Sequence, residues 1–149
     1  MPVENSINII NSRGLSENVS IDYDAWTKFI SYYRYYIDEF AEDILGIKLF
    51  PFQRVILRAM NRGQFSCLIA CRGLGKSWIV CVFYICISIL YTNIKCGIAS
   101  GNSQQAKNVI IQKLKGELYK NENVAIEMVR EPRTSGDDCY GEFNNGSEI

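Results

Sequence analysis

Residues Cys67 to Ser77 read C-L-I-A-C-R-G-L-G-K-S and are followed at once by the apolar segment Trp78 to Tyr91. A short apolar run, a glycine-containing turn, Gly-Lys-Ser and a further apolar segment are typical of a phosphate-binding loop between a buried strand and a helix. Glycines let backbone N–H groups converge on phosphate oxygens, and the helix N-terminus adds the positive end of its dipole. The stretch therefore predicts an α/β fold with a phosphate site at this turn.

Each residue of the turn has an expected role. Lys76 is expected to reach the β- and γ-phosphates, and the Ser77 hydroxyl to bind Mg²⁺. The rest of the nucleotide-binding loop is expected to comprise Cys71, Arg72, Gly73, Leu74 and Gly75. The pattern places a glycine six residues before the lysine, where this chain has Ala70. A glycine-rich turn that binds nothing remains the alternative.

The apolar segments before and after the turn predict strands that alternate with helices along the chain. The strands are expected at 67–71, 94–100 and 124–129, and the helices at 77–91 and from Ser103 onward. Such alternation predicts a parallel sheet with helices on both faces. Asn145-Gly146 predicts a two-residue hairpin in the last residues. Because the chain stops in the second arm of that hairpin, we expect an incomplete, truncated sheet.

Two helices are expected before the loop. Apolar residues at helical spacing predict one from Tyr23 to Leu45, ended by Gly46, and Phe50-Pro51 opens a shorter one that Gly63 closes. Gln53 lies on the shorter helix, and its amide donor and acceptor match the N6/N7 edge of adenine. A surface glutamine without a ligand is the alternative. We therefore expect three parts, which are a flexible arm at 1–20, a helical lead-in at 21–63 and an ATPase core at 64–149.

The composition excludes several classes of site. The chain has 149 residues and a formal net charge of zero, so no overall basic field indicates nucleic acid, although a local stripe could bind it. There is no histidine, which excludes histidine catalysis and histidine-containing zinc sites within these residues. The six cysteines form no CxxC pair and indicate buried thiols in a reducing compartment. The segment Trp78 to Tyr91 is shorter than the ~20 residues that span a bilayer.

Hydrolysis of a bound nucleotide needs an acidic residue near Mg²⁺ and a group that orients water. None of the carboxylates downstream of the loop ends an apolar run, and Asp137-Asp138 is interpreted as a solvated turn. The upstream run Tyr35 to Glu39 mimics an apolar strand that ends in Asp-Glu, but it follows a helical period. We therefore expect these residues to bind a nucleotide without hydrolysing it.

Several segments occur in an order that resembles a known family. They are the helical lead-in, Phe50-Pro51-Phe52-Gln53, the Cys71–Ser77 loop, Ala99-Ser100-Gly101-Asn102-Ser103-Gln104-Gln105-Ala106 and Phe143-Asn144-Asn145-Gly146-Ser147. Together, over about residues 24–149, they resemble the N-terminal ATPase domain of the large subunit of tailed-phage terminases, the DNA-packaging motors. The resemblance implies a P-loop NTPase fold of the ASCE type, with ATP and Mg²⁺ as ligands. It also implies an adenine contact by Gln53 and catalytic roles for Lys76 and Arg72 at the γ-phosphate.

For the intact protein, the resemblance implies ATP hydrolysis that translocates double-stranded viral DNA into a procapsid. The implied partners are the portal protein, the terminase small subunit and further copies in a ring, with no membrane, in the host cytoplasm. The nuclease domain of the family has no counterpart in these residues. Two alternatives stay open: another phosphate-loop DNA motor resembling a superfamily 2 helicase, and a non-hydrolysing nucleotide-binding or interaction protein that ends at Ile149.

Overall fold

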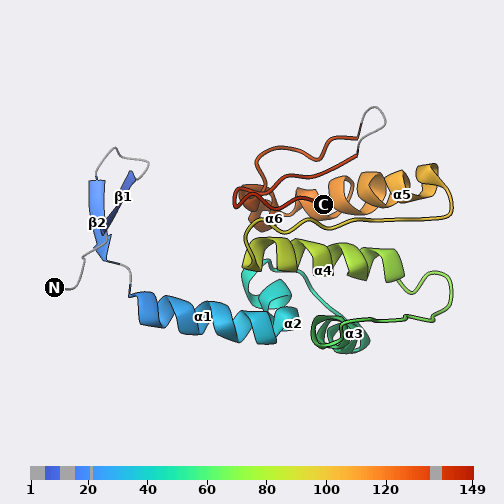
Figure 1. Cartoon of the computed structure of the whole chain (residues 1–149), viewed down its shortest axis with the longest axis horizontal. Helices are drawn as coiled ribbons and strands as arrows, with labels where there is room; N and C mark the ends of the chain where they lie inside the picture. The colour runs from blue at the N-terminus through green and yellow to red at the C-terminus, as the bar shows by residue number, and fades with distance from the viewer. Residues whose placement is uncertain (1–5, 11–15, 21, 135–138) are drawn as a thin grey trace. The chain divides into compact units, whose positions relative to one another are not determined.

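The computed structural model describes residues 6–10, 16–20, 22–134 and 139–149 of the chain (Figure 1). The chain divides into two compact units, Met1–Tyr32 and Tyr33–Ile149. In the arm expected at 1–20, residues 1–5 and 11–15 lie outside the described residues, and so does the predicted Asp137-Asp138 turn.

The first unit contains a β-hairpin and most of a helix. Strand β1 (Ser6–Ile10) pairs antiparallel with β2 (Ser16–Ser20), within the segment that the sequence predicts as an arm. Helix α1 (Tyr23–Tyr35) follows and continues into the second unit. Asp22 caps its start, because the carboxylate accepts the backbone N–H groups of Asp24 and Ala25 at 3.0 and 3.2 Å.

The helix predicted to run from Tyr23 to Leu45 is interrupted at Tyr36. This residue has φ −107° and ψ 65°, and the chain continues as α2 (Ile37–Glu39) and the π-helix η1 (Phe40–Ile44). No residue of α1 is buried, whereas Ile37 and Asp38 are fully buried directly after the break. The break therefore turns the chain so that it enters the core. Gly46 ends the segment with φ 66°, as the sequence predicts.

The two helices on either side of the loop also agree with their sequence signals. Helix α3 (Pro51–Arg62) has proline in its first turn and is followed by Gly63. Helix α4 (Lys76–Leu90) begins at the lysine of the motif and buries seven of its residues. In Figure 1, α4 lies between α3 and the helices that follow it, and it contacts both.

Among the described residues after α4, the chain forms four short helices. They are α5 (Ser103–Val109), the π-helix η2 (Ile110–Lys115), the 3₁₀ helix η3 (Leu118–Lys120) and α6 (Glu122–Glu127). Asn102 caps α5, since its Oδ1 accepts the N–H of Gln104 at 2.9 Å. Within the described ranges, no helix is both long and apolar enough to cross a membrane.

The predicted parallel-sheet P-loop α/β fold is wrong. Residues 67–71 form no strand, 94–100 contain only an isolated bridge from Lys95 to Glu148, and α6 occupies most of 124–129. In the part of the chain that the structure describes, β1 and β2 are the only strands of a sheet. A strand requires a hydrogen-bonded neighbour, and the apolar run before the loop has none, so Ile69 stays 92% exposed.

The last residues hold the C-terminal end of α4. The Asn145 Nδ2 donates to the carbonyl oxygens of Ser88 and Tyr91 at 2.6 and 3.1 Å, and the Gly146 N–H donates to the Phe143 carbonyl. Asn144 and Asn145 are therefore the central residues of the turn, in place of the predicted Asn145-Gly146 pair. The Nε and Nη2 groups of Arg34 also donate to the Leu90 carbonyl, at 3.0 and 2.8 Å. This end of α4 is thus fixed, and its other end carries the loop.

Candidate functional site

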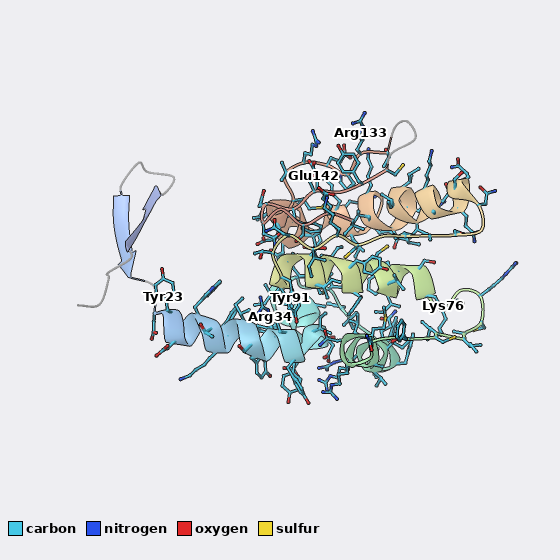
Figure 2. The ribbon with its side chains drawn as sticks, viewed as in Figure 1. Tyr23, Arg34, Lys76, Tyr91, Arg133 and Glu142 are labelled. Carbon is cyan, nitrogen blue, oxygen red and sulfur yellow. The ribbon has the colours of Figure 1, made fainter. Side chains whose placement is uncertain are left out.

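The loop between residues 71 and 75 turns sharply into the N-terminus of α4 (Figure 2). Gly73 and Gly75 have φ +84° and +76°, a left-handed region that favours glycine. A Cβ at Gly73 would meet nothing within 4 Å, so the backbone conformation, and not crowding, requires glycine there. The two glycines of the motif therefore shape the turn as the sequence predicts.

Lys76 is folded back onto the loop that precedes it. Its Nζ donates to the carbonyl oxygens of Ala70 and Cys71 at 2.7 and 2.5 Å. These two bonds hold a positive charge beside the first turn of α4, whose leading N–H groups have no partner within the helix. Both the charge and the backbone donors therefore favour an anion at this place.

Ser77 lies at a cavity between α4 and α5. The cavity has a volume of about 300 Å³, and Lys76 and Ser77 line it together with residues of the segment 98–100 and of α5. Part of its lining is apolar, because Val80 and Val109 contribute to it. None of the described residues that line this cavity carries a carboxylate.

The cavity is also lined by a polar pair that the sequence did not assign to the site. The Ser100 hydroxyl donates to the Gln105 Oε1 at 2.9 Å, and both residues line the cavity. Both residues belong to the Ala99–Ala106 segment on which the resemblance partly rests, but no feature of that segment alone assigns them to a nucleotide site. The pair adds hydrogen-bonding groups to the lining of the cavity.

Arg72 and Leu74 are on the outer side of the loop. The side chain of Arg72 is exposed and forms no ion pair with any residue that the structure describes. Cys71 and Cys67 are exposed as well, in contrast to the buried thiols that the apolar runs predict. Burial does hold for Cys81 and Cys86 of α4, and it raises the pKa of the Cys81 thiol to about 12. The residues of the loop therefore point to solvent, apart from Lys76.

Gln53 is the residue from the helical lead-in that lies beside the loop. It is 8% exposed, and its Oε1 accepts the backbone N–H of Phe50 at 2.9 Å, which caps α3. A Cβ at Gly75 would lie 3.8 Å from its Nε2. The structure thus places Gln53 near the loop as a buried capping residue and not as a surface one, and its adenine contact stays a prediction.

The aromatic residues on either side of Gln53 in the sequence are exposed. Phe50 and Phe52 are 66% and 41% exposed, and their rings stack with centroids 6.0 Å apart. Exposed flat rings can cover a nucleobase. An apolar surface for a base is therefore available near Gln53.

A buried cluster of charges fixes α3 against the preceding segment. Asp38 is fully buried, and its carboxylate accepts the Nε of Arg54 at 3.0 Å and the Nε of Arg58 at 2.7 Å. Glu39 and Glu42 also contact these arginines. The segment Tyr35 to Glu39, which the sequence rejects as an acidic strand, is helical except at Tyr36, and the charge of Asp38 is balanced by α3.

A divalent cation could bind here only with help from a ligand. Among the described residues, no group of three or more histidine, cysteine, aspartate or glutamate side chains could hold a metal ion. Mg²⁺ usually keeps several waters and is bound through substrate phosphates and only one or two protein oxygens. The exposed Ser77 hydroxyl fits that role as a single ligand.

No protein-family model matches the chain, and no curated protein matches it.

Proposed function

We propose that loop 71–77 binds the phosphates of ATP together with Mg²⁺. The backbone N–H groups at the start of α4 and the Lys76 ammonium bind the phosphate oxygens. The Ser77 hydroxyl is the protein ligand of Mg²⁺, which supplies positive charge against the β- and γ-phosphates. Arg72, exposed on the outer side of the loop, is free to turn toward the γ-phosphate.

The observation that carries the proposal is the position of Lys76. Its ammonium is held by the carbonyl oxygens of Ala70 and Cys71, at the mouth of a left-handed glycine turn and beside the first turn of a 15-residue helix. Carbonyl oxygens carry partial charge only. An ammonium that exchanges them for phosphate oxygens gains charge-assisted hydrogen bonds, which are roughly twice as strong as neutral ones. The loop thus holds the Lys76 ammonium where it can exchange its carbonyl partners for the oxygens of a bound phosphate.

For the intact protein we propose the role that the resemblance implies, which is an ATP-driven motor for packaging of double-stranded viral DNA. The support is the order of Phe50–Gln53, the loop and Ala99–Ala106 along the chain. The motor's portal, small-subunit and ring contacts, and its place in the host cytoplasm, belong to the same proposal. An alternative with a helicase-like motor uses the same nucleotide site, and so does a binding protein without hydrolysis.

Calorimetry with ATP and Mg²⁺ tests the nucleotide site. We expect Lys76→Ala to weaken ATP binding by about 1.5–3 kcal/mol, or roughly 10- to 150-fold, because a charge-assisted phosphate contact is lost. The matched control is Lys120→Ala, which removes the same charge from an exposed position on η3 that has no ion pair with a described residue. Equal ATP affinity in wild type and Lys76→Ala would overturn the proposal.

A further inference from the structure

Gln53 is a buried amide with only one of its two polar groups engaged. Its Oε1 accepts the Phe50 N–H at 2.9 Å, and its Nε2 donates no hydrogen bond to any of the described residues. The residue is 8% exposed. Among the described residues, no buried side-chain nitrogen or oxygen lacks a hydrogen-bond partner, so solvent reaches this amine. The amine is therefore available to a neighbouring group without loss of a hydrogen bond within the protein.

The unpaired amine faces the phosphate loop at one residue. Gly75 has no Cβ, but a Cβ placed there would lie 3.8 Å from Nε2, so the amine lies close to this residue without a hydrogen bond to it. Gly75 has φ +76° and ψ 25° as the N-cap of α4, and its carbonyl accepts the first backbone hydrogen bond of that helix, from the Ile79 N–H at 2.9 Å. The amide of Gln53 therefore lies against the turn that orients the leading N–H groups of α4.

The same geometry argues against recognition of the adenine edge by Gln53. Recognition of the N6/N7 edge of adenine uses both the oxygen and the amine of a glutamine. Here the oxygen already caps α3 and the side chain is buried, whereas the exposed surface suited to a base is formed by Phe50 and Phe52. The polar groups of Gln53 are thus directed to its own helix and to Gly75.

We propose that Gln53 is a positioning residue of the phosphate loop, which holds the Gly75 turn from helix α3, and that it acts on phosphate binding and not on base selection. This role rests on the proposed phosphate site. It ties the N-terminus of α3 to the N-terminus of α4 through one side chain. Any ligand with the same phosphate group therefore depends on Gln53 to the same extent, whatever its base.

Two variants separate the capping bond from the contact with Gly75. Gln53→Ala removes both. Gln53→Glu keeps an oxygen that can accept the Phe50 N–H, as glutamate does in capping boxes, but replaces the amine that faces Gly75. Gln112→Ala is the matched control, because Gln112 is an exposed glutamine on η2.

Hydrogen exchange of the free protein gives the first readout, at the amide of Ile79 that bonds to the Gly75 carbonyl. We expect both Gln53→Ala and Gln53→Glu to speed its exchange by roughly three- to tenfold at unchanged helix content. Both variants remove the amine beside Gly75, and this range corresponds to the stability that a single polar interaction typically contributes. Gln112→Ala leaves it unchanged. Unchanged exchange in Gln53→Glu would overturn the role of Gln53 even where the loop binds phosphate.

Calorimetry with ATP, GTP and inorganic tripolyphosphate gives the second readout. Gln53→Glu is left out of it, because an added negative charge weakens anion binding by itself. We expect Gln53→Ala to weaken all three ligands by the same factor, roughly three- to tenfold. Weakening of ATP with tripolyphosphate unaffected would identify Gln53 as a base contact and overturn the proposal. So would no weakening of any ligand.

The two proposals fail in different ways. If wild type does not bind tripolyphosphate, or if Lys76→Ala binds it equally well, then the phosphate site itself is refuted. If Lys76→Ala weakens tripolyphosphate while Gln53→Ala does not, then the site stands and the positioning role of Gln53 is refuted.

Discussion

Replacing Asp38 with asparagine measures how strongly the lead-in segment is held to α3. The Asp38 carboxylate is fully buried and accepts hydrogen bonds from Arg54 (3.0 Å) and Arg58 (2.7 Å). Asparagine has nearly the same size, but it removes the charge and presents an amine to one of the two guanidinium groups. We expect Asp38→Asn to lower the free energy of unfolding by about 2–3 kcal/mol.

That magnitude follows from the surroundings of the cluster. Breaking a buried pair by removing one partner typically costs about 3–5 kcal/mol, because the other charge is left buried. Here the side chains of Arg54 and Arg58 are 38% and 34% exposed, so water screens them once Asp38 is gone. Glu39 also remains 3.1 Å from Arg58, and Glu42 remains 3.4 Å from Arg54. The expected loss is therefore below the usual range.

The loss should depend on pH in a direction that the cluster fixes. Burial raises the pKa of Asp38, but the hydrogen bonds from Arg58 and Arg54 outweigh it and lower that pKa below its ordinary 3.8. A carboxyl whose pKa is lowered by folding stabilises the protein above its unfolded pKa, and that stabilisation is lost as pH falls through the folded pKa. The difference between wild type and Asp38→Asn should be constant near pH 7 and shrink below about pH 4.

Urea denaturation followed by circular dichroism, from pH 7 down to pH 3, measures both effects. Glu122→Gln is the control, because it neutralises an exposed carboxylate that has no ion pair with a described residue. Its effect should stay within about 0.5 kcal/mol. The reasoning is refuted if Asp38→Asn is as stable as this control at pH 7, or if its deficit persists unchanged at pH 3.

Two further predictions concern the ends of α4. Asn145→Ala removes the amide that binds the Ser88 and Tyr91 carbonyl oxygens, so thermal denaturation should show a loss of about 1–3 kcal/mol, and a melting temperature equal to wild type would contradict it. At the other end, the described lining of the cavity beside Ser77 has no carboxylate to orient water, so we expect no phosphate release from ATP and Mg²⁺ above background. Turnover that Lys76→Ala abolishes would show that the acidic residue lies elsewhere in the chain.

Helices that carry local start and stop signals could be predicted from the sequence. Pro51 and Gly63 limit α3, Gly46 ends the segment before it, and the Gly-Lys-Ser turn begins α4. Each signal acts within one helical turn, through a fixed φ, a left-handed glycine or a missing N–H. The break at Tyr36 has no such signal. It follows from burial of Ile37 and Asp38, which depends on contacts with segments distant in sequence.

Strands could not be predicted with the same rules, because pairing is not a local property. The run Cys67 to Ala70 is apolar enough for a strand, yet no neighbouring backbone pairs with it, and it stays largely exposed. The stretch 124–129 has strand-like residues, but Asn121 caps a helix there by accepting the N–H of Asn123 at 3.0 Å. Asn121, which precedes the apolar stretch, therefore favours a helix over a strand there.

The candidate site was predictable to the extent that it lies within one loop. The left-handed glycines and the position of Lys76 follow from seven consecutive residues, whereas the Ser100–Gln105 pair reaches the cavity only through the path of the chain after α4. Gln53 is intermediate, since its proximity to the loop was anticipated but its burial and its capping bond were not. Residue type indicated what each side chain can bind, and packing decided which of its groups is still available.

The two glycines set the turn of the exposed loop, and the two flanking helices hold its ends. Its residues from Cys71 to Leu74 are exposed, so local contacts contribute little to its stability. The far end of α4 is fixed by Arg34 and Asn145, and α3 is fixed by the pair of arginines on Asp38. Between these anchors, the side chain of Gln53 extends from α3 to the neighbourhood of Gly75, where a Cβ would lie 3.8 Å from its Nε2. We therefore expect a change at Asp38 to affect the proposed phosphate site through α3 and Gln53.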